Sequence, residues 1–136
     1  MEITVSTEQG RVPVTIVKPH GDLDASNYSE LVERVEDLIK GGAQDFVIDL
    51  SDVPYMSSAG LVALHSVAIT LRGEKPVNPE SGWAALKSMD RSRGSGVQKH
   101  IKLLSPQANV AGTFDKAGFT QFFEVFTDIQ KAVASF

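Results

Sequence analysis

A strand, a tight turn and a helix follow one another directly between residues 46 and 71, and this succession constrains the fold more than any other part of the chain. Residues 46–50 form an almost continuous apolar run, which is typical of a strand buried on both faces of a sheet. Pro54 ends the strand's hydrogen-bond ladder because it has no backbone N–H. Apolar residues then recur at helical spacing from Leu61 to Leu71, which predicts an amphipathic helix.

Two adjacent serines, Ser57 and Ser58, lie where this helix begins. The first backbone N–H groups of a helix lack intrahelical acceptors, and the helix dipole is positive at this end. A serine hydroxyl here can cap the helix, and the same position favours a phosphoryl group. The residues alone leave both interpretations open: a serine serves as a structural cap, or a serine carries a phosphoryl group. Gly60 would let a bulky partner approach closely.

The turn itself reads Met-Ser-Ser-Ala-Gly-Leu over residues 56–61. Together with the strand before it, this turn resembles the signature of STAS domains, the anti-sigma factor antagonist family, which usually reads Met-Asp-Ser-Ser-Gly-Leu or Met-Asp-Ser-Thr-Gly-Leu. In that family the first hydroxyl residue after the Asp is phosphorylated by a partner serine kinase that is also an anti-sigma factor. The resemblance implies that Ser58 is this phosphoacceptor.

Two further matches follow in the order that the family has. The Gly-Asp-Leu-Asp turn over residues 21–24 resembles the family's Gly-Glu-Leu-Asp turn, which lies beside the phosphoacceptor turn in that fold. Residues 105–119 resemble the family's third helix and its closing Gly-Leu, so the resemblance covers most of the chain except about 72–99. It implies a partner-binding surface made by both turns, with the residues Asp22, Asp24, Tyr55, Met56, Ser57, Ser58, Ala59 and Gly60.

The turn departs from the family pattern at two positions. Ser57 stands where the family has its Asp, and Ala59 stands where it has the second hydroxyl residue. The leading hypothesis is an anti-sigma factor antagonist-like regulator that binds an anti-sigma factor serine kinase and is released by phosphorylation of Ser58. The alternatives are phosphorylation at Ser57, a non-phosphorylated STAS subunit of a lipid transporter or signalling complex, and a small-ligand or nucleotide-binding module.

The remaining apolar patterns predict further strands and helices in an α/β order. A hairpin pairs strands at 3–5 and 12–17, and a helix follows over 28–39. Asn27 and Glu30 are spaced as a capping box for this helix, with Ser26 as an alternative cap, and glycines stand at its end. Strands at 101–104 and 122–126 and helices at 107–116 and 129–133 complete the pattern. With the resemblance, this indicates one STAS-like domain over residues 1–136, with a mixed β-sheet, helices mainly on one face and an inserted segment at about 72–99.

Composition narrows the function classes. The 136 residues are 42% hydrophobic, which suits one core, and their net charge of −4 disfavours nucleic acid and favours a protein partner. The chain has no cysteine and no apolar run long enough to span a membrane, which fits a cytoplasmic protein. Its three histidines lack metal-ligand spacing, and it has no Walker-type phosphate loop. We therefore expect a protein without cofactor, metal or enzymatic activity.

Overall fold

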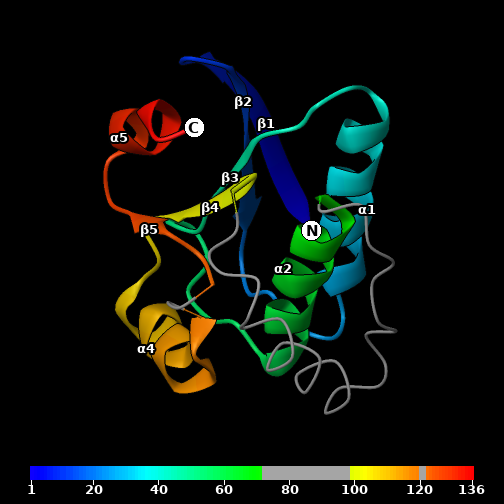
Figure 1. Ribbon diagram of the computed structural model, residues 1–136. Coiled ribbons are helices and arrows are strands. Elements are labelled where there is room, and N and C mark those ends of the chain that lie inside the picture. The colour runs from blue at the N-terminus through cyan, green and yellow to red at the C-terminus, as the bar shows by residue number, and fades with distance from the viewer. Residues whose placement is uncertain (72–98, 120–121) are drawn as a thin grey trace.

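The computed structural model describes residues 1–71, 99–119 and 122–136 (Figure 1). Within them five strands form one sheet in the order β1-β2-β3-β4-β5, accompanied by four helices. The strands are β1 (Glu2–Gln9), β2 (Pro13–His20), β3 (Phe46–Asp49), β4 (Ile101–Leu104) and β5 (Val125–Phe126). The helices are α1 (Tyr28–Lys40), α2 (Ser58–Leu71), α4 (Ala108–Ala117) and α5 (Ile129–Ala134). The predicted insertion at about 72–99 lies, up to residue 98, outside the described residues.

The sheet is mixed, as predicted. β1 and β2 form the predicted antiparallel hairpin, with Glu2 opposite His20 and Gln9 opposite Pro13, while β2, β3, β4 and β5 run parallel to one another. Parallel neighbours need a crossover connection, and α1 supplies it between β2 and β3. The carboxyl ends of the four parallel strands therefore meet at one edge of the sheet, and the turn that precedes α2 lies at this edge.

The two faces of the sheet bury separate apolar clusters. Side chains alternate between the faces along a strand, so Val17 belongs to one cluster and its neighbour Ile16 to the other. Residues of α1, α2 and α4 pack in the first cluster, whereas α5 packs in the second through Ala132 and Val133. Figure 1 shows α5 across the sheet from α1. The prediction of helices mainly on one face is confirmed, and the short α5 is the exception.

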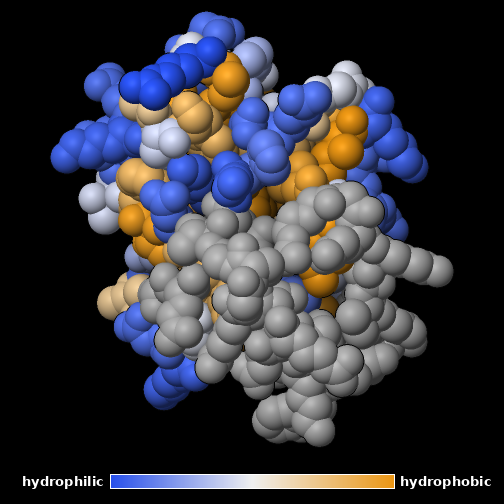
Figure 2. Space-filling model, viewed as in Figure 1, coloured by the Kyte–Doolittle hydropathy of each residue, from blue (hydrophilic) through white to orange (hydrophobic). Residues whose placement is uncertain are grey.

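The two helices that follow β2 and β3 differ in their burial. α1 is amphipathic, because Leu31 and Val35 are fully buried while its outer side is mainly hydrophilic (Figure 2). The prediction of an amphipathic helix is wrong for α2, since every residue from Gly60 to Ile69 is buried. Its sequence is apolar on all sides, and a helix of this kind belongs in an interior. The apolar spacing located α2 correctly but did not show that its whole circumference is buried.

The predicted capping box of α1 is wrong. Asn27 is the N-cap residue, but its side chain makes no capping hydrogen bond and Glu30 does not complete a box. The Asn27 amide instead bonds to the loop before it: its Oδ1 accepts from the Asp24 N–H at 3.0 Å, and its Nδ2 donates to the Asp22 carbonyl at 2.7 Å. The Asn27 side chain thus stabilises the preceding loop instead of capping α1 as the sequence pattern predicted. At the far end Gly42 has the predicted positive φ, 108°.

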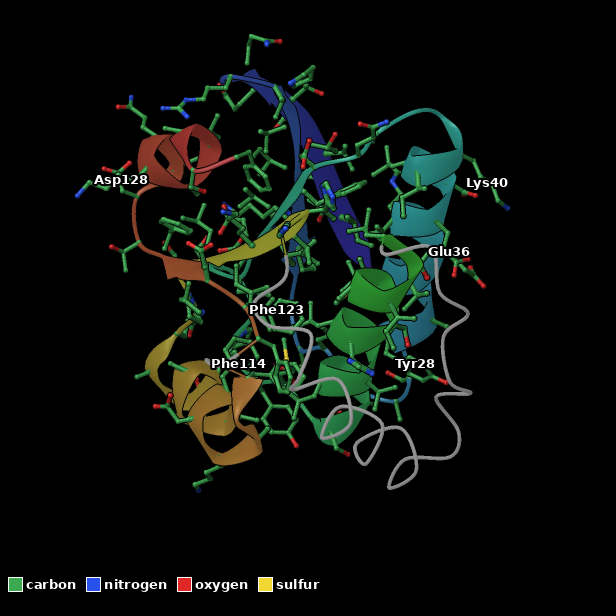
Figure 3. The ribbon with its side chains drawn as sticks, viewed as in Figure 1. Tyr28, Glu36, Lys40, Phe114, Phe123 and Asp128 are labelled. Carbon is green, nitrogen blue, oxygen red and sulfur yellow. The ribbon has the colours of Figure 1, made fainter. Side chains whose placement is uncertain are left out.

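The predicted strand at 122–126 is shorter than expected. Only Val125–Phe126 form β5, because Phe122 and Phe123 are buried in the core, 4% and 2% exposed. The Phe119 ring packs against Phe114 and Phe123, with centroid distances of 5.7 and 5.3 Å. Figure 3 shows Phe114 and Phe123 in the region between α4 and α2. The alternating pattern of residues 122–126 favours strand pairing, but burying the large aromatic side chains in the core stabilises the fold more.

Replacing Phe119 by alanine tests this aromatic cluster. Phe119 is fully buried, so the substitution removes its transfer free energy and leaves a cavity, and the free energy of unfolding should fall by about 3–5 kcal/mol. Urea denaturation followed by circular dichroism measures this loss. The matched control is Val125→Ala, at a side chain that is 39% exposed, which should cost less than about 1 kcal/mol. Equal losses in the two variants would contradict the assignment of Phe119 to the core.

Candidate functional site

The two serines at the start of α2 have different roles. Ser57 is the residue before the helix, and its Oγ accepts a hydrogen bond from the Ala59 backbone N–H at 3.2 Å. This is the contact of an N-cap side chain, so the structural interpretation left open by the sequence applies to Ser57. Ser58 is the first residue of α2, its side chain is exposed, and its hydroxyl makes no hydrogen bond within the described parts of the chain. The hydroxyl of Ser58 is therefore exposed and makes no bond to the part of the fold that the structure describes.

The two predicted turns lie side by side. Leu23 and Met56 form an isolated parallel β-bridge, in which the Leu23 N–H donates to the Tyr55 carbonyl and the Ser57 N–H donates to the Leu23 carbonyl, both at 3.0 Å. A further bond, from the Gly21 N–H to the Asp52 carbonyl at 2.9 Å, joins the same two loops. The resemblance implied this neighbourhood, and the backbone hydrogen bonds are its physical cause.

Met56 and Gly60 lie beneath the surface of the turn. Met56 is 2% exposed and Gly60 is also buried, so neither presents surface to a partner, in contrast to what the predicted binding surface assumed. A Cβ added at Gly60 would collide with Met56 Cγ and stand 3.0 Å from the Leu23 carbonyl oxygen. Gly60 thus allows a close approach, but the group that approaches is the chain's own loop. The exposed or half-buried members of the predicted surface are Asp22, Asp24, Tyr55, Ser57, Ser58 and Ala59.

The carboxylate of Asp24 is held in place by its neighbour. The Ser26 hydroxyl donates to Asp24 Oδ1 at 2.5 Å and the Ser26 backbone N–H donates to the same oxygen at 2.9 Å. These two bonds favour the ionised form and lower the pKa of Asp24 below its ordinary value. With the exposed Asp22, Asp24 adds negative charge to the loop beside the turn between β3 and α2. We call this turn, residues 50–58, the serine turn.

Two side chains hold the serine turn from another side: one belongs to α4, and the other belongs to the N-cap residue just before this helix. Asn109 Nδ2 donates to the Pro54 carbonyl, and Gln107 Nε2 donates to the Ser51 carbonyl at 2.9 Å. These partners are 55 and 56 residues apart in sequence, so no local pattern could have identified them. Tyr55, next to the tethered Pro54, is 51% exposed, the highest exposed fraction of any large hydrophobic side chain in the described part of the chain.

A polar chain of three residues holds the loop after β3 against the hairpin. His20 Nδ1 and Asp52 Oδ2 are 2.6 Å apart, and His20 Nε2 lies 2.8 Å from Thr4 Oγ1. No local sequence pattern links Thr4, His20 and Asp52, because they meet only when β1, β2 and the loop after β3 come together. Among residues 1–71, 99–119 and 122–136, no three His, Asp or Glu residues are grouped so that they could hold a metal ion. No helix in these ranges is long and apolar enough to cross a membrane.

Solved structures share this fold along nearly the whole chain. A candidate anti-sigma factor antagonist from Thermotoga maritima has a TM-score of 0.70 at 16% identity, over 96% of this chain and 90% of that one. An anti-sigma factor antagonist from Mycobacterium paratuberculosis has a TM-score of 0.65 at 16% identity, over 98% and 93%. The antagonist SpoIIAA in its unphosphorylated form has a TM-score of 0.54 at 11% identity, over 97% and 94%. At these identities the likeness establishes the fold.

The sequence itself establishes the family. The family model of the STAS domain matches residues 5–75, which is more than half of the chain and includes the hairpin, α1, β3 and both turns of the site. The matched region thus holds the backbone bridge between Leu23 and Met56 and the serine at the start of α2. The chain belongs to the STAS domain family.

Proposed function

We propose that this protein is an anti-sigma factor antagonist-like regulator that binds an anti-sigma factor serine kinase and releases it when Ser58 is phosphorylated. The observation that carries the proposal is the division of roles at the start of α2. Ser57 uses its hydroxyl as the helix cap, whereas the neighbouring Ser58 is exposed and its hydroxyl has no partner among the described residues. A kinase can reach such a hydroxyl, and its modification leaves the cap intact.

The names of the similar structures support the same role. Three proteins with this fold are described as anti-sigma factor antagonists or as a candidate for one, and SpoIIAA is described in its unphosphorylated form. By analogy with them, this chain would regulate transcription in the cytoplasm through a protein partner, as a phosphoprotein and a substrate of the kinase, with no reaction of its own. The transfer of this role depends on the turn around Ser58.

The switch follows from charge at the docking surface. A phosphoryl group brings about −1.5 to −2 charges at neutral pH, and here it would join the carboxylates of Asp22 and Asp24 in the neighbouring loop. The start of α2 accommodates this charge, because the helix dipole is positive there and backbone N–H groups lack acceptors. The fold of the protein is therefore kept, while a partner that docks on Tyr55 and Ser58 would have to desolvate the phosphoryl group. Phosphorylation thus weakens docking without refolding.

A second candidate function rests on Ser57. The STAS signature usually carries a carboxylate at this position, and here a neutral cap takes its place. If the kinase requires that carboxylate, the two turns would dock a partner permanently, as in a non-phosphorylated STAS subunit of a lipid transporter or signalling complex. The two functions share the docking surface and differ only in the modification of Ser58.

Phosphate mapping decides between the two functions. Incubation with ATP and an anti-sigma factor serine kinase from the same organism should add one phosphoryl group, located on Ser58 by fragment mass spectra. The group should persist in Ser57→Ala and be lost in Ser58→Ala, because of these two serines Ser58 is the exposed one, and its hydroxyl makes no hydrogen bond with the described residues. A phosphoryl group on Ser57 alone would reassign the acceptor, and complete absence of modification would favour the permanent subunit.

Substitutions at the two adjacent serines should separate partner binding from stability, because each should change one of these quantities and leave the other nearly unchanged. Ser58→Asp should weaken binding of the kinase at least about tenfold, while the free energy of unfolding changes by no more than about 1 kcal/mol, because a negative charge suits the start of α2. Ser57→Ala should leave binding nearly unchanged and lower the free energy of unfolding by about 0.5–2 kcal/mol, because it removes the cap. Calorimetric titration and urea denaturation measure the two quantities.

The paired design also shows how the proposal can fail. If Ser58→Asp binds as tightly as the unmodified protein, negative charge at this position does not control docking. If Ser58→Asp loses several kcal/mol of stability, the serine has a structural role and its effect on binding is indirect.

A further inference from the structure

A pocket opens at the edge of the sheet opposite to the serine turn. Its volume is about 710 Å³, within the range of small-molecule sites, and it is lined by residues that precede β3 and β4 and by residues around α5. The serine turn follows the carboxyl end of β3, so the strands separate the two places. The lining residues that matter below are Asp45, His100, Lys102, Glu124, Ser135 and Phe136.

A buried ammonium group forms one wall of this pocket. The Lys102 side chain comes from β4 and is 5% exposed. Its Nζ lies 3.2 Å from Glu124 Oε1 and 3.3 Å from the Ser135 carbonyl oxygen, and 4.8 Å from the centroid of the Phe136 ring. A bond between an ammonium and a carboxylate is usually about 2.7–2.9 Å long, so the contact with Glu124 is longer than usual. Glu124, Ser135 and Phe136 also line the pocket, whereas the Phe126 ring, whose centroid is 5.8 Å from Nζ, is not part of its lining.

A structural role for Lys102 explains only part of this arrangement. The ammonium holds the residues after α5 near the sheet through the Ser135 carbonyl and the Phe136 ring. This role needs neither a hollow of this size beside the ammonium nor a counter-ion that can move away. Glu124 is such a counter-ion, because its side chain is 48% exposed and reaches Lys102 from the solvent side.

The charges and walls of the pocket indicate the class of ligand. Asp45 is engaged by His100, with Asp45 Oδ1 and His100 Nδ1 2.9 Å apart, so Glu124 is the carboxylate that faces Lys102. Val12 and the Phe136 ring supply apolar surface in the same lining. The anionic group of a ligand would pair with the desolvated ammonium of Lys102, and its apolar body would pack against these walls.

We propose that this pocket binds a small organic carboxylate with an apolar body, whose carboxylate takes the place of Glu124 on Lys102. In the free protein Glu124 occupies the anion position and competes with the ligand. The site is independent of the serine turn, and the proposal does not rest on phosphorylation or on the kinase.

The proposal is tested by titrating the full chain with phenylacetate at constant pH and ionic strength. The backbone amide signals in NMR spectra monitor the binding. Saturable shifts are expected at Lys102, Glu124 and Phe136 and not at the serine turn, with a Kd of about 1 mM or tighter. Acetate, which lacks the apolar body, should bind more weakly, and phenethylamine, which carries the opposite charge, should not bind. Equal binding of phenylacetate and phenethylamine, or no saturable shift with phenylacetate, would overturn the proposal.

Two variants should shift the affinity in opposite directions. Lys102→Met keeps an apolar stem and removes the ammonium, so binding should be lost, whereas Glu124→Gln removes the competing charge and should lower the Kd about tenfold. Lys99→Met, which removes an exposed cation from the same lining, is the control and should change the Kd no more than about threefold. An unchanged Kd in Glu124→Gln would refute the site, and this exposed substitution decides the matter alone if Lys102→Met does not fold.

Discussion

Two backbone hydrogen bonds between the loop after β2 and the loop after β3 hold the candidate site together. They form the bridge between Leu23 and Met56, and they fix where Ser57 stands when α2 begins. The bridge requires that nothing larger than a hydrogen atom projects from Gly60, because a Cβ there would meet Met56 and Leu23. The signature turn is therefore in part a packing motif, and its buried members Met56, Gly60 and Leu61 explain why Ser58 is presented in one defined place.

In the proposed function, adjacent residues would divide stability from signalling. Ser57 contributes to the helix through its hydroxyl, whereas the hydroxyl of Ser58 makes no hydrogen bond with the described residues. Asp24 would belong to the signalling side of this division, because the bonds from Ser26 orient its carboxylate and lower its pKa. A charge added at Ser58 would then act on the surface alone, since the helix start tolerates it. This explains how one small modification could control docking without a conformational change.

The sheet also separates two kinds of chemistry. Its carboxyl edge carries the exposed serine and acidic loop, and its amino edge carries the pocket beside Lys102. The side chain of Lys102 takes part in the packing on the face that α5 covers, near Phe126 and Phe136, whereas the serine turn joins the core on the other face through Met56. The first three residues of β3, Phe46, Val47 and Ile48, are all apolar and buried, because each face of the sheet has its own cluster. The two proposed sites therefore lie at opposite edges of the sheet and are built on different faces of it.

The sequence by itself determined the elements made by consecutive residues: the hairpin, the buried β3, the positions of α1 and α2, and two hydroxyls at the start of a helix. Periodicity and turn chemistry are local properties, so they can be read without coordinates. Only the tertiary structure decided which serine is the cap, why Met56 and Gly60 are buried, why Phe122 and Phe123 leave the strand, and what surrounds Lys102. Each of these depends on contacts between residues far apart in the chain, and strand order and register, not local pattern, bring those residues together.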